Sequence, residues 1–259
     1  MPKFKLRLEY DGSAYNGWQI QKGKERTIQG ACFDACRQVF DTADFEFYGA
    51  GRTDAGVHAL GQAAHLKVQT TLRSDVIKMR LNDALPNSIN ILAVDKAKDQ
   101  FHARHDAIAR SYVYQISLRK NAFGKKYAWW IKDQLDVKHM QQAAELFVGM
   151  KDFQSFSNEK GSEKSTVVEV KHLQVHAKGD FIVVHIIGSH FLWKMVRRVV
   201  GILAEVGRGK LQEKQIRSYF EQPSNETAQF TAPAAGLFLE RVYYPGESIQ
   251  PQFKTLFAL

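Results

Sequence analysis

The sequence has few of the features that mark membrane or secreted proteins. No apolar run in its 259 residues approaches the roughly 18 residues that span a bilayer. The opening stretch, MPKFKLRLEY, alternates apolar and charged residues instead of forming the apolar core of a signal peptide. The only cysteines, Cys32 and Cys36, lie four residues apart in a helical pattern, a spacing more typical of core packing than of a disulfide. These absences favour a cytoplasmic protein with reduced, structural cysteines.

Metal-binding patterns are equally scarce. His102 and His105 lie in the stretch FHARHD, with no H-E-x-x-H or C-x-x-C pattern nearby. Structural and catalytic zinc sites normally show such spacings, because several ligands must converge on one ion. The sequence therefore predicts no metal site.

Positive charge is what the sequence has in excess. Lys and Arg total 36 against 27 acidic residues, which gives a formal net charge of +9. This excess favours a polyanionic partner such as nucleic acid. The alternative is a generally basic protein whose lysines lie on solvated helix faces. A composition of 44% hydrophobic and 24% charged residues is that of an ordinary globular protein, and the length fits two cores of about 100 to 150 residues each.

Local patterns in the first half predict the order β-α-β-β-α-β. Alternation from Phe4 to Tyr10 predicts a strand with one buried face. Helical spacing of apolar residues from Ile28 to Phe40 predicts a helix that Thr27 caps. The other expected elements are strands at 45–48, 62–69 and 89–94 and a helix near 75–85 that is begun by Ser74 and stopped before Pro86.

The second half predicts the same order without repeating the sequence. A continuous apolar stripe from Leu192 to Leu203 marks its longest helix. The other expected elements are a strand at 111–118, a helix from Asp136 to about 148, paired strands around the turn at 178–180, a helix near 211–221 and a strand at 236–244. The expected fold is therefore α+β, with two ferredoxin-like halves, 1–105 and 106–259, whose antiparallel sheets pack around a central basic cleft.

The stretch YGAGRTDAGVHA at 48–59 places charged residues among three glycines. A dinucleotide-binding fingerprint would require glycine where Asp54 stands, and that carboxylate would repel a pyrophosphate. A P-loop would require lysine and a hydroxyl residue where Val57 and His58 stand. No nucleotide cofactor is therefore expected. A surface turn whose glycines adopt positive φ, with Asp54 hydrogen-bonded to the local backbone, is the structural alternative to a catalytic role.

Four stretches together resemble the tRNA pseudouridine synthase A family over nearly the whole chain. They are EYDGSAYNGWQIQ at 9–21, GAGRTDAGVHA at 49–59, ARSYVY at 109–114 and FLWKMVRRVVG at 191–201. The loop at 49–59 is the most specific, because a match of that length does not arise by chance. The resemblance implies isomerisation of uridine to pseudouridine in the anticodon stem-loop of tRNA, at positions 38, 39 and 40. It also implies that no cofactor is needed and that the protein is a homodimer.

The resemblance also implies roles for particular residues. Asp54 is the catalytic aspartate that attacks the target uridine, at the base or at the sugar carbon, and either route needs an ionised carboxylate. Arg197 pairs with this aspartate from the opposite half. Arg52 fills the space left by the flipped nucleotide or, alternatively, contacts a phosphate. Tyr112 receives the flipped base on its ring. From spacing alone, Tyr112 would be a core residue and Arg197 an exposed helix residue.

A non-catalytic RNA-binding protein is the alternative from another functional class, because two positively charged ferredoxin-like halves would also suit RRM-type binding. The absence of an RNP1-like pattern argues against it. Trp129 and Trp130 could stack on RNA, but adjacent residues of a strand point to opposite faces, so at least one is expected in the core. Neither these residues nor Trp193 and Lys194 are given a role.

Overall fold

The computed structural model describes residues 1–21, 23, 26–158 and 165–251, which form two compact units. The first unit combines Met1–Ile108 with Phe238–Glu247, and the second contains Ala109–Leu237 and a short segment that begins at Ser248. Both units are of the α+β class, with mostly antiparallel strand pairing. In the described ranges, none of the helices combines the length and the apolar character needed to cross a bilayer.

The first unit has the element order that the sequence predicts. Its elements are β1 (Lys3–Tyr10), α1 (Ile28–Phe40), β2 (Phe45–Gly49), β3 (His58–Val68), α2 (Ser74–Ala84) and β4 (Ile89–Ala97). The predicted helix cap is confirmed, because Thr27 Oγ1 accepts a hydrogen bond from the Gly30 amide at 3.1 Å. The α2 helix begins at Ser74, as expected, and is followed at Leu85 by extended backbone.

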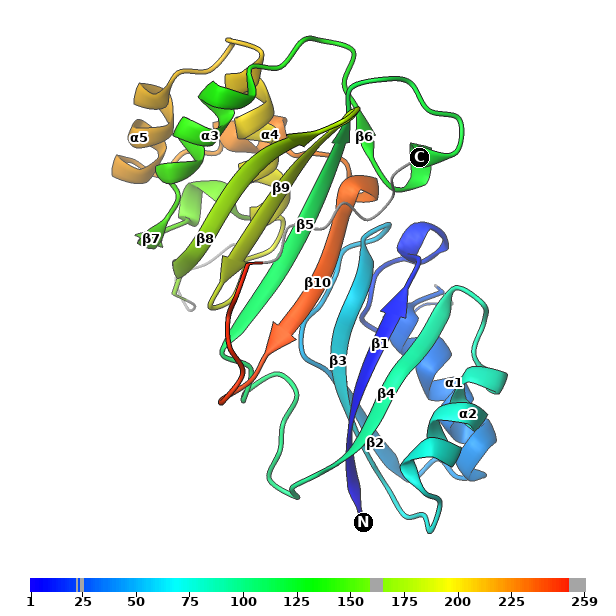
Figure 1. The fold of residues 1–259 in the computed structure, drawn as a ribbon. Helices are drawn as coiled ribbons and strands as arrows, with labels where there is room; N and C mark the ends of the chain where they lie inside the picture. Colours follow the sequence, from blue (N-terminus) through cyan, green and yellow to red (C-terminus); the bar gives the residue numbers. More distant parts are fainter. Residues whose placement is uncertain (22, 24–25, 159–164, 252–259) are drawn as a thin grey trace. The chain divides into compact units, whose positions relative to one another are not determined.

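The sheet of the first unit has the strand order β4-β1-β3-β2, with antiparallel pairing throughout. β1 lies between β3 and β4, and its inward residues Phe4, Leu6 and Leu8 are buried. Figure 1 shows α1 and α2 on one face of this sheet, which they cover. The alternation seen in the sequence of β1 therefore separates a helix-covered core face from a more exposed face.

The last strand, β10 (Leu237–Tyr243), returns to the first unit. It pairs in parallel with the start of β3, with Phe238 opposite His58 and Leu239 opposite Ala59. A Cβ added at Gly61 would lie 2.4 Å from the Glu240 carbonyl oxygen, so a side chain there would block this approach. The sequence pattern at 236–244 predicts this strand correctly. Local alternation does not identify a partner so distant in the sequence.

The second unit contains a sheet with the order β5-β9-β8-β7, again antiparallel. Its strands are β5 (Ala109–Ser117), β6 (Trp129–Trp130), β7 (Gly149–Asp152), β8 (Val167–Lys178) and β9 (Phe181–Gly188), and its helices are α3 (Val137–Glu145), α4 (Met195–Gly207) and α5 (Glu213–Glu221). The short β6 pairs in parallel with the end of β5. The predicted turn between β8 and β9 is confirmed, with Gly179 at φ +58°. Trp129 and Trp130 were expected to be strand residues, although no bounds were predicted for β6, and β7 was not predicted.

The α4 helix starts later than its apolar stripe suggests. Leu192 and Trp193 precede it, and Lys194 adopts a left-handed conformation with φ +64° at the helix N-cap. A periodic pattern cannot reveal this break, because Leu192 continues the apolar spacing. Within the helix, a Cβ added at Gly201 would meet the Phe230 carbonyl oxygen at 1.5 Å. The α4 helix therefore packs directly against the backbone that leads towards β10.

Candidate active site

The loop that contains Asp54 joins β2 to β3 and is tied at its start. The Ala50 amide donates to the Ala63 carbonyl at 2.7 Å, and Gln62 Nε2 donates to the Gly51 carbonyl at 2.9 Å. After Asp54, its own carbonyl accepts from the Val57 amide at 3.1 Å and closes a tight turn. Asp54 is therefore half-buried at the start of an ordered turn.

The segment after β1 holds the residues that flank Asp54. The Tyr10 hydroxyl and Thr53 Oγ1 are hydrogen-bonded at 2.8 Å, and the Thr53 carbonyl accepts from the Trp18 amide at 3.0 Å. On the other side, the Gly56 amide donates to the Tyr15 carbonyl at 3.3 Å. The stretch that resembles the family's opening turn thus acts as a clamp on the candidate catalytic loop.

Two glycines of this clamp allow the close contact between the segments. Gly17 has φ +89°, and a Cβ there would lie 2.6 Å from the Thr53 carbonyl oxygen. A Cβ at Gly12 would lie 1.9 Å from the Val57 carbonyl oxygen. Larger residues at either position would push the loop away. His58 adds a further tie, because its buried Nδ1 accepts from the Gly12 amide at 3.1 Å.

The glycines of the loop itself have three different functions. Gly56 adopts φ +77°, as its turn requires. A Cβ at Gly49 would lie 2.4 Å from the Trp18 ring, so this glycine makes room for packing. Among the described residues, no atom lies within 4 Å of a Cβ placed at Gly51. Of these three, only Gly51 fits the idea that a missing side chain leaves open space near the nucleophile.

Arg52 and Asp54 both belong to the first unit, whereas Tyr112 and Arg197 belong to the second. Arg52 is exposed. Tyr112 lies on β5 with only 8% of its surface exposed, and its ring packs at right angles to Phe191 with 5.3 Å between centroids. The burial of Tyr112 agrees with a core position and leaves its substrate role as a proposal.

Arg197 is not the exposed helix residue that spacing alone suggests. It is half-buried on α4, and its Nε donates to the Ala232 carbonyl at 2.7 Å. The Ala232 amide in turn donates to the Arg197 carbonyl at 3.0 Å. Burial raises the pKa of the nearby Tyr114 hydroxyl, and the positive charge of Arg197 opposes that rise. The hydrogen bond to the Ala232 carbonyl therefore holds the Arg197 guanidinium group in position.

Arg198, the next residue, has a structural role that the sequence analysis missed. Its side chain is only 3% exposed and donates to the carbonyls of Ser155 at 3.1 Å and Ser157 at 2.6 Å. It also donates to Thr227 Oγ1 and to Asn158 Oδ1. Burial lowers the pKa of the guanidinium group. Arg198 therefore ties α4 to two neighbouring segments of the second unit.

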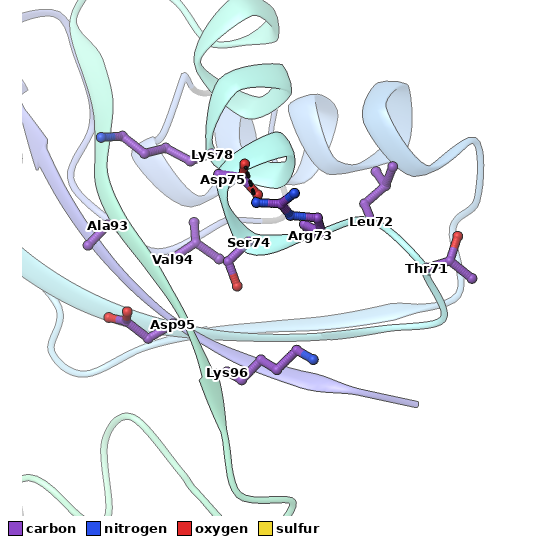
Figure 2. Close-up of a pocket in the computed structure, with 10 residues that line it drawn as sticks. All are labelled: Thr71, Leu72, Arg73, Ser74, Asp75, Lys78, Ala93, Val94, Asp95 and Lys96. Atoms are coloured by element: carbon purple, nitrogen blue, oxygen red, sulfur yellow. Dashed lines mark ion pairs between the residues drawn. The ribbon is translucent and has the colours of Figure 1, made fainter.

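A separate pocket of about 680 Å³ lies beside the start of α2 (Figure 2). None of the four predicted site residues lines it. Its lining carries both signs of charge, and Arg73 and Asp75 form an ion pair at 3.2 Å across its edge. The pocket is therefore distinct from the candidate active site. Mixed charge also makes it poorly suited to a polyanion.

Both cysteines lie in the core of the first unit. Cys32 and Cys36 are free and buried, which confirms their prediction as core residues. Burial raises the pKa of the Cys36 thiol to about 12, so it is an unreactive thiol at neutral pH. In the described part of the chain, no group of three or more His, Cys, Asp or Glu side chains is arranged to hold a metal ion.

Comparisons with known proteins identify the class to which this fold and loop belong. A family model described as tRNA pseudouridine synthase matches residues 8–106 and 143–245. A protein named tRNA pseudouridine synthase A 2 from Bacillus cereus is 38% identical over 246 residues, which cover 94% of this chain and all of the relative. One named tRNA pseudouridine synthase A from Thermodesulfovibrio yellowstonii is 38% identical over 262 residues, with the same coverage of both chains. The chain belongs to the tRNA pseudouridine synthase family.

The family-model match covers the site unevenly. Its first range contains the Asp54 loop together with the clamp formed by residues 10–18, and its second contains Arg197 and β10. Tyr112 lies between the two matched ranges. The proposed role of Tyr112 therefore depends on the shorter resemblance of the ARSYVY stretch.

Proposed function

We propose that this protein isomerises uridine to pseudouridine in tRNA. The observation that carries the proposal is the ordered loop of the family's characteristic sequence, with Asp54 between two residues held by hydrogen bonds. In this reaction the N-glycosidic bond breaks, and a carbon–carbon bond forms between the same sugar carbon and C5 of the base. The C5 proton is lost and N1 gains one. Product and substrate are isomers, so no cofactor or second substrate is required.

Asp54 is proposed as the nucleophile, because its carboxylate can bond covalently to the substrate while the base turns. The clamp formed by residues 10–18 fixes the backbone of Thr53 and Gly56, the neighbours of the reacting residue. A nucleophile on a fixed backbone loses less orientational freedom when it reaches the transition state. This arrangement supports a catalytic role for Asp54 over that of an ordinary surface turn.

Arg52, Tyr112 and Arg197 are proposed to bind the substrate. Arg52 is exposed two residues before Asp54, where it can fill the space of an extruded nucleotide or contact a phosphate. The aromatic ring of Tyr112 can receive the extruded base. Arg197 supplies a cation whose orientation is fixed by its hydrogen bond to Ala232.

The proposed substrate is the anticodon stem-loop of tRNA, at positions 38 to 40, and the proposed assembly is a homodimer, as the family resemblance implies. A net charge of +9 supports binding to a polyanion. We also propose that each unit is ferredoxin-like. The order β4-β1-β3-β2 with two helices on one face supports this architecture in the first unit.

A positional assay tests this function. Unmodified tRNA transcripts are incubated with the protein, and pseudouridine is mapped at each uridine. Product at positions 38 to 40 is expected without any added cofactor. Product only elsewhere in the tRNA would exclude the anticodon-arm assignment but not the reaction. Tight binding with no product at any position would instead favour a non-catalytic RNA-binding protein.

A further inference from the structure

A basic loop with exposed aromatic residues lies in the second unit, between the two matched ranges of the family model. It is the segment 118–132, LRKNAFGKKYAWWIK, which runs from the end of β5 through β6 (Figure 1). We call it the basic loop. It contains five Lys or Arg residues and no acidic residue. Such a segment attracts polyanions more strongly than the average surface of this chain does.

The aromatic side chains of the basic loop are more exposed than the sequence suggests. Phe123 is 83% exposed and Trp130 is 44% exposed. At least one of Trp129 and Trp130 was expected in the core, but Trp129 is only half-buried. Lys120 Nζ lies 5.8 Å from the centre of the Trp130 ring. Exposed aromatic faces among lysines are the combination with which proteins bind unpaired nucleotides.

Hydrogen bonds hold the basic loop in its conformation. Asn121 Oδ1 accepts from the amides of Phe123 at 2.9 Å and Gly124 at 3.1 Å. Gln115 Nε2, on β5, donates to the Tyr127 carbonyl at 3.0 Å. The Ile131 amide donates to the Ser117 carbonyl at 3.0 Å. Because both ends and the tip are tied, the fold itself keeps Phe123 in solvent, and binding would require little further ordering.

Most of the positive charge in the basic loop is not neutralised by neighbouring carboxylates. Arg119 forms an ion pair with Asp180 at 2.5 Å. Within the ranges that the structure describes, no ion pair joins Lys120, Lys125 or Lys132 to an acidic side chain. Lysine is depleted at protein–protein interfaces. Charge and composition therefore favour a nucleic acid over a protein as the partner of this surface.

We propose that the basic loop is a further contact surface for tRNA, in which Lys120 and Lys125 bind phosphates and Phe123 stacks on an unpaired base. This inference rests on the proposed function for the identity of the RNA. The surface contributes to affinity and lies outside the group of residues proposed to act on the reacting uridine. Its loss should therefore raise KM and leave kcat at saturating tRNA unchanged.

Two variants and two matched controls test the proposal by filter binding of unmodified tRNA over a salt series. Phe123→Ala should weaken binding by at least about fivefold, the lower limit for the loss of one stacked base. Lys120→Gln with Lys125→Gln should reduce the slope of log affinity against log salt by about 1.4 to 1.8, for two phosphate contacts. The controls are Met150→Ala, at a residue 73% exposed, and Lys210→Gln with Lys214→Gln, at exposed residues of the second unit. Both should bind like wild type.

Two results would overturn the proposal. One is unchanged tRNA affinity and salt slope in both loop variants, with unfolding curves like that of wild type. The other is a change in oligomeric state in Phe123→Ala with unchanged tRNA affinity, which would indicate a protein contact. Because the test measures binding and not product formation, the inference stands even if wild type forms no pseudouridine. Conversely, product formation by wild type combined with normal binding by the loop variants would refute this inference alone.

Discussion

The Tyr10 hydroxyl lies 2.8 Å from Thr53 Oγ1, in a buried hydrogen bond one residue before Asp54. Tyr10 is the last residue of β1, so this bond joins the sheet of the first unit directly to the candidate catalytic loop. Only 4% of Tyr10 and 8% of Thr53 are exposed, and water therefore cannot easily replace the missing partner if one hydroxyl is removed. The position of Asp54 should depend on this pair.

Tyr10→Phe is expected to lower both stability and turnover. The change leaves the buried Thr53 hydroxyl without this partner, at a cost of about 1 to 3 kcal/mol in the free energy of unfolding. Tyr15→Phe is the matched control, because it removes a hydroxyl bonded to Ser88 at 2.7 Å but keeps the backbone bond to Gly56. Urea unfolding and kcat should be measured for both. Equal losses of kcat in the two variants would contradict a special role for the Tyr10–Thr53 bond.

Gly51→Ala and Gly17→Ala test whether each glycine makes room for substrate or for packing within the protein. Gly51→Ala should change the free energy of unfolding by less than about 0.5 kcal/mol, because its added Cβ meets no described atom within 4 Å. Its kcat/KM should nevertheless fall if substrate occupies that space. Gly17→Ala should destabilise the protein by more than about 1 kcal/mol, because its φ is +89° and the new Cβ would clash with Thr53. If Gly51→Ala is fully active, that side of the loop does not face substrate.

Although the two residues are neighbours, Arg197→Met should mainly reduce turnover, whereas Arg198→Met should mainly reduce stability. Arg197→Met removes the hydrogen bond to the Ala232 carbonyl, which should lower the free energy of unfolding by about 1 kcal/mol, and it should abolish most of the turnover. Arg198→Met leaves the buried carbonyls of Ser155 and Ser157 without this donor and should cost roughly 2 kcal/mol or more.

The comparison needs turnover per folded molecule, with the folded fraction determined from unfolding curves of each variant. Folded Arg198→Met should keep turnover within a few-fold of wild type. An Arg197→Met variant with normal turnover would show that Arg197 serves only to attach α4 to Ala232.

Local sequence signals were sufficient for the parts of the fold that depend on neighbouring residues. Thr27 was predicted as a helix cap because its hydroxyl needs only the amide of Gly30, three residues away. The buried face of β1 follows from alternation alone. The break before α4 escaped prediction, since Lys194 adopts φ +64° without any change in the apolar spacing.

The site was predictable where a motif contains it and unpredictable where it depends on distant contacts. The Asp54 loop stood out as a continuous motif, but nothing in that motif shows that Tyr10, Gly12 and Gly17 hold it in place. The burial of Arg198 likewise depends on Ser155 and neighbours about 40 residues away in sequence. The pairing of β10 with β3 could not be predicted for the same reason, because the two strands are far apart in the sequence.

His65 should make the stability of the first unit depend on pH. Burial, and secondarily the charge of His102, lowers the pKa of His65 from 6.5 to about 4, while its Nδ1 accepts a hydrogen bond from the Ala103 amide at 3.1 Å. Because the folded-state pKa is the lower one, the unfolded chain takes up the proton first. The stabilising contribution is therefore present above pH 6.5 and is lost as the pH falls towards 4.

His65→Asn tests this assignment through the free energy of unfolding between pH 7 and pH 5. The wild-type value should fall on acidification, with His65 contributing up to about 1.4 kcal/mol per pH unit. The variant should be less stable at pH 7 but should show a shallower decline. His139→Asn, at an exposed residue beside Asp136, controls for the loss of an imidazole. An identical decline in His65→Asn and wild type would exclude His65 as a source of the pH dependence.

The most direct measurement is pseudouridine formation by Asp54→Asn with unmodified tRNA, alongside the dissociation constant of that tRNA. The amide keeps the shape of the side chain but removes the nucleophilic carboxylate. We expect product to fall to the level without enzyme, while tRNA binds within a few-fold of wild type and the unfolding curve is unchanged. Substantial turnover by a homogeneous Asp54→Asn protein would contradict the assignment of Asp54 as the catalytic residue.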